Sequence, residues 1–147
     1  MAVIRAEPHY PSDKYLNDAE KCIVEKLSFD DVAVMSIYLY ADAMFMDKAK
    51  KVMKKFKKVC GHVDDVKHMD EDDIEALDWK QAYNLKFAQI LENNGLEPMI
   101  DEYGALGWID KCGGKHFGDD YYIFPLYADK ETLEKDLKEF NENCEEL

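Results

Sequence analysis

The feature that most constrains the fold is a nearly continuous apolar run from Val32 to Met46. It is 15 residues long and includes Ser36 and Asp42, so it is too short and too polar to cross a bilayer as a helix. A helix that is apolar on all sides has to be covered on several sides by other elements. The whole chain has 147 residues, the size of one ordinary domain. We therefore expect a single domain over residues 1–147, built around this helix.

The segments beside the run also have helical spacing. In residues 12–27, apolar side chains recur three or four positions apart, which predicts one buried helix face. Ser28 followed by Asp31 is typical of a capping box at a helix start. The helix that begins there is expected to reach Gly61, with a break near Asp42.

The second half of the chain mixes helical and strand patterns. We expect a loop over 62–70, a helix from Asp70 or Asp72 to Asn94, a short helix beginning at Pro98, a hairpin around Gly113 and Gly114, and a helix over 132–144. A small strand is also expected at residues 2–4. The predicted class is α+β, with four to five helices and a small antiparallel hairpin or sheet near the C-terminal third.

Charge is distributed unevenly along the chain. The sequence has 19 basic and 32 acidic side chains, and its formal net charge is −13. Residues 1–61 carry 11 basic and 9 acidic side chains, whereas residues 62–147 carry 8 basic and 23 acidic side chains. Such a balance argues against direct nucleic-acid binding, which needs positive charge for the phosphates, and against adhesion to an anionic membrane.

The acidic residues instead favour a protein partner with a basic surface. Carboxylates on a rigid surface can imitate the phosphates of a duplex, so the partner is expected to handle nucleic acid, and the chain to act as its inhibitor or regulator. The candidate partner-binding residues are Asp64, Asp65, Asp70, Glu71, Asp72, Asp73, Glu75, Asp78, Asp101, Glu102, Asp119 and Asp120.

Two other charged patterns predict no ligand. The first is a run of seven lysines between Lys48 and Lys58, for which a solvated helix face is the simpler interpretation than a phosphate site. The second is the acidic stretch from Asp70, where an EF-hand loop would need an oxygen ligand at Ile74 and a glycine at Glu75. We expect no metal, no cofactor and no enzymatic activity.

The spacing of the cysteines indicates the redox state of the cellular compartment in which the protein is expected. Cys22, Cys60, Cys112 and Cys144 are far apart, and no C-x-x-C pair occurs. The first residues contain no apolar signal core. These observations predict a cytoplasmic protein with reduced thiols.

Two alternative functions stay open. Cys60, His62, Cys112 and His116 have the ligand types of a tetrahedral zinc site, or of a Cys/His-dependent enzyme. Alternatively, the chain is a structural module that self-associates through the apolar helix or through the aromatic strand over 121–127. The sequence leaves the oligomeric state open.

Overall fold

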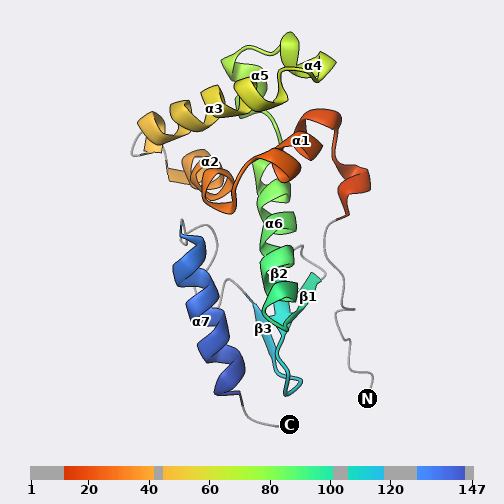
Figure 1. Ribbon diagram of the computed structural model, residues 1–147, viewed down its shortest axis with the longest axis vertical. Coiled ribbons are helices and arrows are strands. Elements are labelled where there is room, and N and C mark those ends of the chain that lie inside the picture. Colours follow the sequence, from red (N-terminus) through yellow and green to blue (C-terminus); the bar gives the residue numbers. More distant parts are fainter. Residues whose placement is uncertain (1–11, 42–44, 101–105, 118–128, 145–147) are drawn as a thin grey trace. The chain divides into compact units, whose positions relative to one another are not determined.

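A computed structural model describes residues 12–41, 45–100, 106–117 and 129–144 (Figure 1). Its elements are η1 (Asp13–Tyr15), α1 (Asp18–Lys26), α2 (Phe29–Ala41), α3 (Met46–Cys60), α4 (Asp64–Lys67), α5 (Glu71–Glu75), α6 (Trp79–Asn93), β1 (Glu97–Ile100), β2 (Leu106–Ile109), β3 (Lys115–Phe117) and α7 (Lys130–Glu142). The α+β class is confirmed. The helices are more numerous than expected, because α4 and α5 are separate short turns of helix.

Contacts within the chain group it into two compact units. The first is Ser12–Lys86, which holds α1 to α5 and the first half of α6. The second contains Phe87–Leu147, with the rest of α6, the sheet and α7. The single domain over residues 1–147 stays a prediction.

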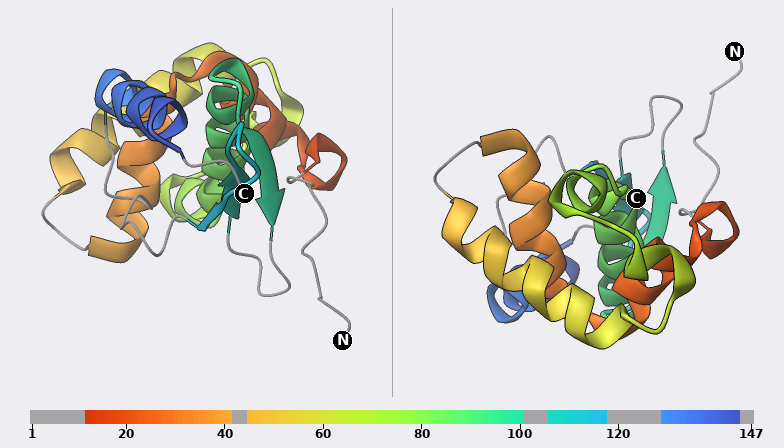
Figure 2. Two further views of the ribbon diagram at one scale, coloured as in Figure 1. Left: turned by 90° about the horizontal axis from the view of Figure 1, so that it is seen from below. Right: turned by 90° about the horizontal axis from the view of Figure 1, so that it is seen from above.

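In the first unit, α3 packs against both α1 and α2 (Figure 2). Its apolar stripe is buried, from Ala49 through Val52, Met53 and Phe56 to Cys60. The ring of Phe56 meets that of Trp79 edge-on at 5.8 Å. The lysines of α3 lie on the exposed face, as helical spacing requires.

Residues 32–41 of the apolar run lie in α2, whose core-facing side chains are buried as expected. Val32, Ala33 and Met35 have no exposed surface. The buried hydroxyl of Ser36 donates a hydrogen bond to the carbonyl oxygen of Trp79 at 3.1 Å, so this polar group is satisfied inside the core. The helix ends at Ala41, next to the expected break.

Reciprocal side-chain bonds that the local sequence encodes cap the starts of α1, α2 and α5. At α2, Ser28 Oγ accepts from the N–H of Asp31 and Asp31 Oδ2 accepts from the N–H of Ser28, so the expected capping box is confirmed. At α1, Asn17 and Glu20 form the same arrangement.

Glu20 also reaches a distant segment of the chain. Its second carboxylate oxygen accepts from the N–H of Asp78 at 2.6 Å, just before α6. Asp78 in turn accepts from the N–H of Gln81, which begins a new helix. The single helix expected from Asp70 or Asp72 to Asn94 is wrong, because α5 ends at Glu75 and α6 starts at Trp79.

The second unit contains an antiparallel sheet in the order β1-β2-β3. The short helix expected from Pro98 is wrong, since Pro98 lies in β1 opposite Trp108. An edge strand tolerates proline because one side of its backbone needs no partner. The turn into β1 uses Gly95, whose φ of 76° also ends α6. The expected hairpin turn at Gly113 and Gly114 is confirmed between β2 and β3, but β3 is Lys115–Phe117, and the run over 121–127 expected as the second strand lies outside the described residues.

Helix α7 buries Leu133 and Leu137, as its spacing predicted. Phe140 packs its edge against Trp108 at 6.0 Å and against His116 at 4.5 Å. The strands expected at residues 2–4 and 121–127 lie outside the described residues.

Candidate functional site

All four cysteines are paired in disulfides. Cys22 bonds to Cys60 within the first unit, and Cys112 bonds to Cys144 within the second. Their Cα atoms are 6.0 and 6.1 Å apart, the separation that a disulfide spans without backbone movement. The expectation of reduced thiols is therefore wrong for this structure.

The pairing also leaves no free thiol in the alternative zinc set of Cys60, His62, Cys112 and His116. Each of its two sulfurs is bonded to another cysteine, so neither is a thiolate ligand. The His116 Nε2 atom lies 2.6 Å from Asp110 instead.

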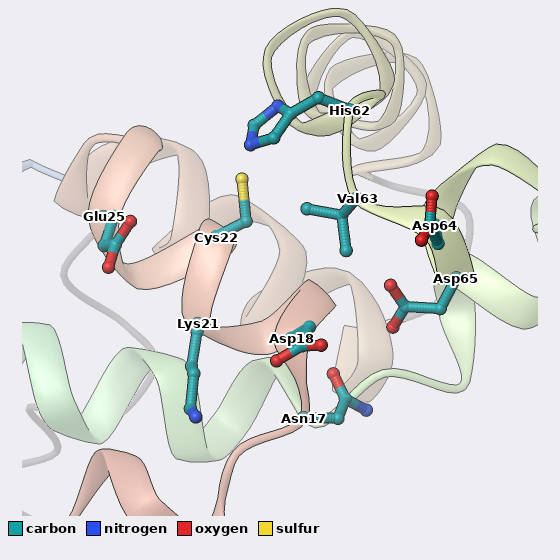
Figure 3. Close-up of a pocket in the computed structure, with 9 residues that line it drawn as sticks. All are labelled: Asn17, Asp18, Lys21, Cys22, Glu25, His62, Val63, Asp64 and Asp65. Atoms are coloured by element: carbon teal, nitrogen blue, oxygen red, sulfur yellow. The ribbon is translucent and has the colours of Figure 1, made fainter.

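The first disulfide stands beside an open pocket of about 700 Å³ (Figure 3). One wall comes from α1 and its N-cap residue, and the other from the turn after α3 and the first two residues of α4. Its lining residues are Asn17, Asp18, Lys21, Cys22, Glu25, His62, Val63, Asp64 and Asp65.

The pocket has acidic groups on both walls. Asp18 and Glu25 lie on one face of α1 with Cys22 between them, because residues three to four apart share a helix face. Asp64 and Asp65 come from the first turn of α4. Against these four carboxylates the lining offers a single ammonium group, that of Lys21. The concave surface is therefore suited to a cation or to a basic side chain.

The cysteine bridge explains how the walls meet. Cys22 is on α1, and Cys60 is the last residue of α3, two positions before His62. The bond joins residues 38 positions apart and fixes α1 beside the turn that leads to α4. In Figure 3 the imidazole of His62 lies over the sulfur of Cys22.

Of the residues predicted to bind a partner, Asp64 and Asp65 line this pocket. The other predicted residues that the structure describes differ in their surroundings. Asp70, Asp73 and Asp78 are exposed but accept backbone hydrogen bonds at helix starts. Glu75 is half-buried and accepts from the hydroxyl of Tyr38 at 3.3 Å.

Several exposed carboxylates, including that of Asp65 in the pocket, have no structural bond among the described residues. Within the described part of the chain, the side chains of Asp65, Glu71 and Asp72 accept no hydrogen bond and form no ion pair. Asp64 has a long contact of 3.5 Å with exposed Lys67. The remaining predicted residues, Asp101, Glu102, Asp119 and Asp120, lie outside the described residues.

Sequence reasoning missed the α1 side of the pocket, namely Asp18, Lys21 and Glu25. They lie far from the acidic stretch in sequence and in a segment of balanced charge. The signal that would have found them is the pairing of Cys22 with Cys60. Four cysteines allow three pairings, so the spacing alone does not select it.

A second polar cluster surrounds Asp110 in the turn between β2 and β3. This buried carboxylate accepts from the N–H groups of Cys112 and Gly114, each at 2.9 Å, and faces His116. Burial alone would raise the pKa of Asp110, but these hydrogen bonds outweigh it and hold the pKa below its ordinary value. A side chain at Gly114 would collide with the carboxylate, because its Cβ would lie 2.6 Å from Oδ2.

No family model matches the chain, and no curated protein or solved structure is significantly similar to it. Among the described helices, none is long and apolar enough to cross a membrane. The geometry of the two clusters therefore carries the functional argument by itself.

Proposed function

We propose that the chain is a non-enzymatic acidic binding protein that docks on the basic surface of a protein partner. The observation that carries this proposal is the pocket with four carboxylates on its two walls. A concave acidic surface concentrates the electrostatic potential and attracts a cationic group more strongly than a flat one does. Its volume of about 700 Å³ is within the usual range of ligand pockets and accommodates lysine or arginine side chains.

Outside the pocket, α5 carries Glu71 and Asp72, which are exposed and have no hydrogen-bond or ion-pair partner among the described residues. A partner that normally holds phosphates presents clustered lysine and arginine side chains. We therefore infer a nucleic-acid-handling partner, which the chain inhibits or regulates by competing with its nucleic acid. The seven exposed lysines of α3 belong to the same unit and would repel a basic partner, so they restrict the orientation in which it docks.

The compartment is part of the same proposal. A cytoplasmic location stays a prediction from the sequence. The two disulfides favour an oxidising setting, because reducing compartments keep most thiols unpaired. Measuring the thiol content of the protein under non-reducing conditions, directly after extraction from its host, distinguishes the two settings.

The docking proposal is tested by titrating a fluorescent oligo-arginine peptide with the oxidised full chain at low and high ionic strength. The double variant Asp64→Lys/Asp65→Lys is compared with Glu131→Lys/Glu139→Lys, which changes the net charge equally with two exposed residues of α7. We expect the pocket variant to lose about tenfold in affinity, or ~1.4 kcal/mol. The control should stay close to wild type, and added salt should weaken wild-type binding.

Equal losses in the two variants would show that the peptide senses only net charge, and the pocket assignment would be wrong. Circular dichroism of both variants confirms that they fold. A pull-down from host lysate, with and without competitor DNA, then tests the partner class. The proposal requires a basic nucleic-acid-handling protein that is released by DNA.

A further inference from the structure

The Cys112–Cys144 disulfide lies in a cluster that contains more than a structural crosslink. One carboxylate oxygen of Asp110 and the two sulfurs all lie within 4.8 Å of one another. Asp110 is buried, and its side chain is only 3% exposed. Two thiolates and a carboxylate are ligands that Zn²⁺ accepts together.

We propose that, in the reduced protein, Asp110, Cys112 and Cys144 bind a zinc ion in place of the disulfide. The chemistry balances with a thiol as reductant. Two thiol molecules are oxidised to their disulfide, the Cys112–Cys144 bond breaks, and each cysteine sulfur gains a hydrogen. Zinc binding then releases one proton from each cysteine and forms two Zn–S bonds.

The polypeptide holds the two cysteines together without the disulfide. Asn141 Oδ1, on α7, accepts from the N–H of Lys111 at 3.0 Å, directly beside Cys112 in the turn. The side-chain amide of Asn141 also donates to the carbonyl oxygen of Asn94 at 3.3 Å. These bonds keep the end of α7 next to the turn after reduction. A tetrahedral zinc site needs the two sulfurs about 3.8 Å apart, which side-chain rotation supplies.

The carboxylate is oriented before any metal arrives. Asp110 Oδ1 accepts from two backbone N–H groups of the turn, and Oδ2 faces His116 Nε2 at 2.6 Å. The His116 ring is itself fixed, since it stacks on Trp108 at 5.7 Å and meets Phe140 edge-on. Outer partners of this kind orient a metal-binding carboxylate, and their loss typically weakens binding 10- to 100-fold. A water molecule completes the four ligands, as in other zinc sites with three protein donors.

The experiment uses the full chain with Cys22→Ser and Cys60→Ser, kept reduced by a phosphine that does not provide thiols. Cobalt(II) is the probe, because its thiolate complexes absorb strongly and zinc displaces it. We expect one cobalt per chain with a thiolate-to-metal band. The band should disappear in Cys112→Ser and in Cys144→Ser, and the affinity should fall 10- to 100-fold in His116→Phe.

The absence of a thiolate–cobalt band, or a band that survives Cys112→Ser, would overturn the proposal. If the Cys22→Ser/Cys60→Ser chain fails to fold, the same cobalt titration is made with the reduced wild-type chain and with its Cys112→Ser/Cys144→Ser variant. Alkylation gives a second readout. Zinc should protect Cys112 and Cys144 of the reduced wild-type chain from iodoacetamide, and equal labelling with and without zinc would contradict the site.

Discussion

One buried side chain, that of Glu20, links α1 to the residue just before α6. Glu20 is 6% exposed and uses both carboxylate oxygens, one for the N–H of Asn17 and one for the N–H of Asp78. A glutamine at this position keeps one accepting oxygen and places an N–H₂ group against the other donor. The charge of Glu20 is therefore less important here than its two acceptors.

We expect Glu20→Gln to destabilise the fold by about 1–3 kcal/mol, the cost of leaving a buried donor unsatisfied. Urea unfolding measures the change. Glu25→Gln is the matched control, because this glutamate lies on the same helix, is exposed and should change stability by less than about 0.5 kcal/mol. Similar values for the two variants would show that the bond to Asp78 contributes little.

The residues of the candidate sites were foreseeable in part. Asp64 and Asp65 stood out in the sequence because local charge density is visible there. Asp110 did not, because its role depends on Cys112, Gly114 and His116 converging in a turn. That convergence depends on the strand register, which a single sequence does not fix for so short a hairpin.

At the scale of elements, signals between neighbouring residues predicted the structure well. The capping box formed by Ser28 and Asp31 correctly predicted the start of α2. The break between α5 and α6 was missed because Glu20, which caps that break, lies 58 positions away from Asp78. Pro98 was misassigned because a proline that suits a first helical turn equally suits an edge strand, and only pairing with Trp108 decides between them.

The start of α2 should respond to acid. Burial of Asp31 acts to raise its pKa, but hydrogen bonds from Lys55 and Ser28 and the Lys55 charge lower it overall. A carboxyl whose pKa is lowered by folding contributes its full stabilisation when the pH is above the ordinary pKa of about 3.9. This contribution is lost as the pH falls through the lowered pKa of the folded state.

We therefore expect wild type to exceed Asp31→Asn in stability at neutral pH by less than about 1 kcal/mol, because the side chain of Lys55 is 49% exposed and solvent screens the pair. The difference should vanish in acid. Thermal unfolding across pH measures both. A difference that persists below the lowered pKa of Asp31 would mean that the charge of Asp31 is not its source.

Helix α7 depends on its apolar face. Leu137 is 1% exposed, whereas the neighbouring Lys138 lies on the open side. We expect Leu137→Ala to cost about 2–5 kcal/mol, from lost burial and the cavity left behind. Lys138→Ala should change stability by less than about 0.5 kcal/mol. Denaturant unfolding, monitored by tryptophan fluorescence, tests the contrast.

At the scale of the whole molecule, each compact unit contains one disulfide. The bonds join residues 38 and 32 positions apart, and closing loops of this length stabilises a fold by about 4 kcal/mol each in the chain-entropy account. Measured values for native disulfides usually fall between about 2 and 5 kcal/mol.

Replacing Cys22 and Cys60 by serine should therefore raise amide hydrogen exchange mainly within Ser12–Lys86, and replacing Cys112 and Cys144 mainly within the second unit. Exchange followed by mass spectrometry of peptides resolves the two responses. Uniform acceleration along the whole chain after either change would show that the two units unfold as one.

The same two bonds determine how much chain a mechanical force can extract. When the ends of the oxidised protein are pulled apart, the segments between Cys22 and Cys60 and between Cys112 and Cys144 are bypassed by covalent bonds. With at most about 3.6 Å per residue, separations of 38 and 32 positions hide roughly 140 and 115 Å of extension. Reduction would release both lengths, so the reach of the unfolded chain under tension depends on the redox state of its surroundings.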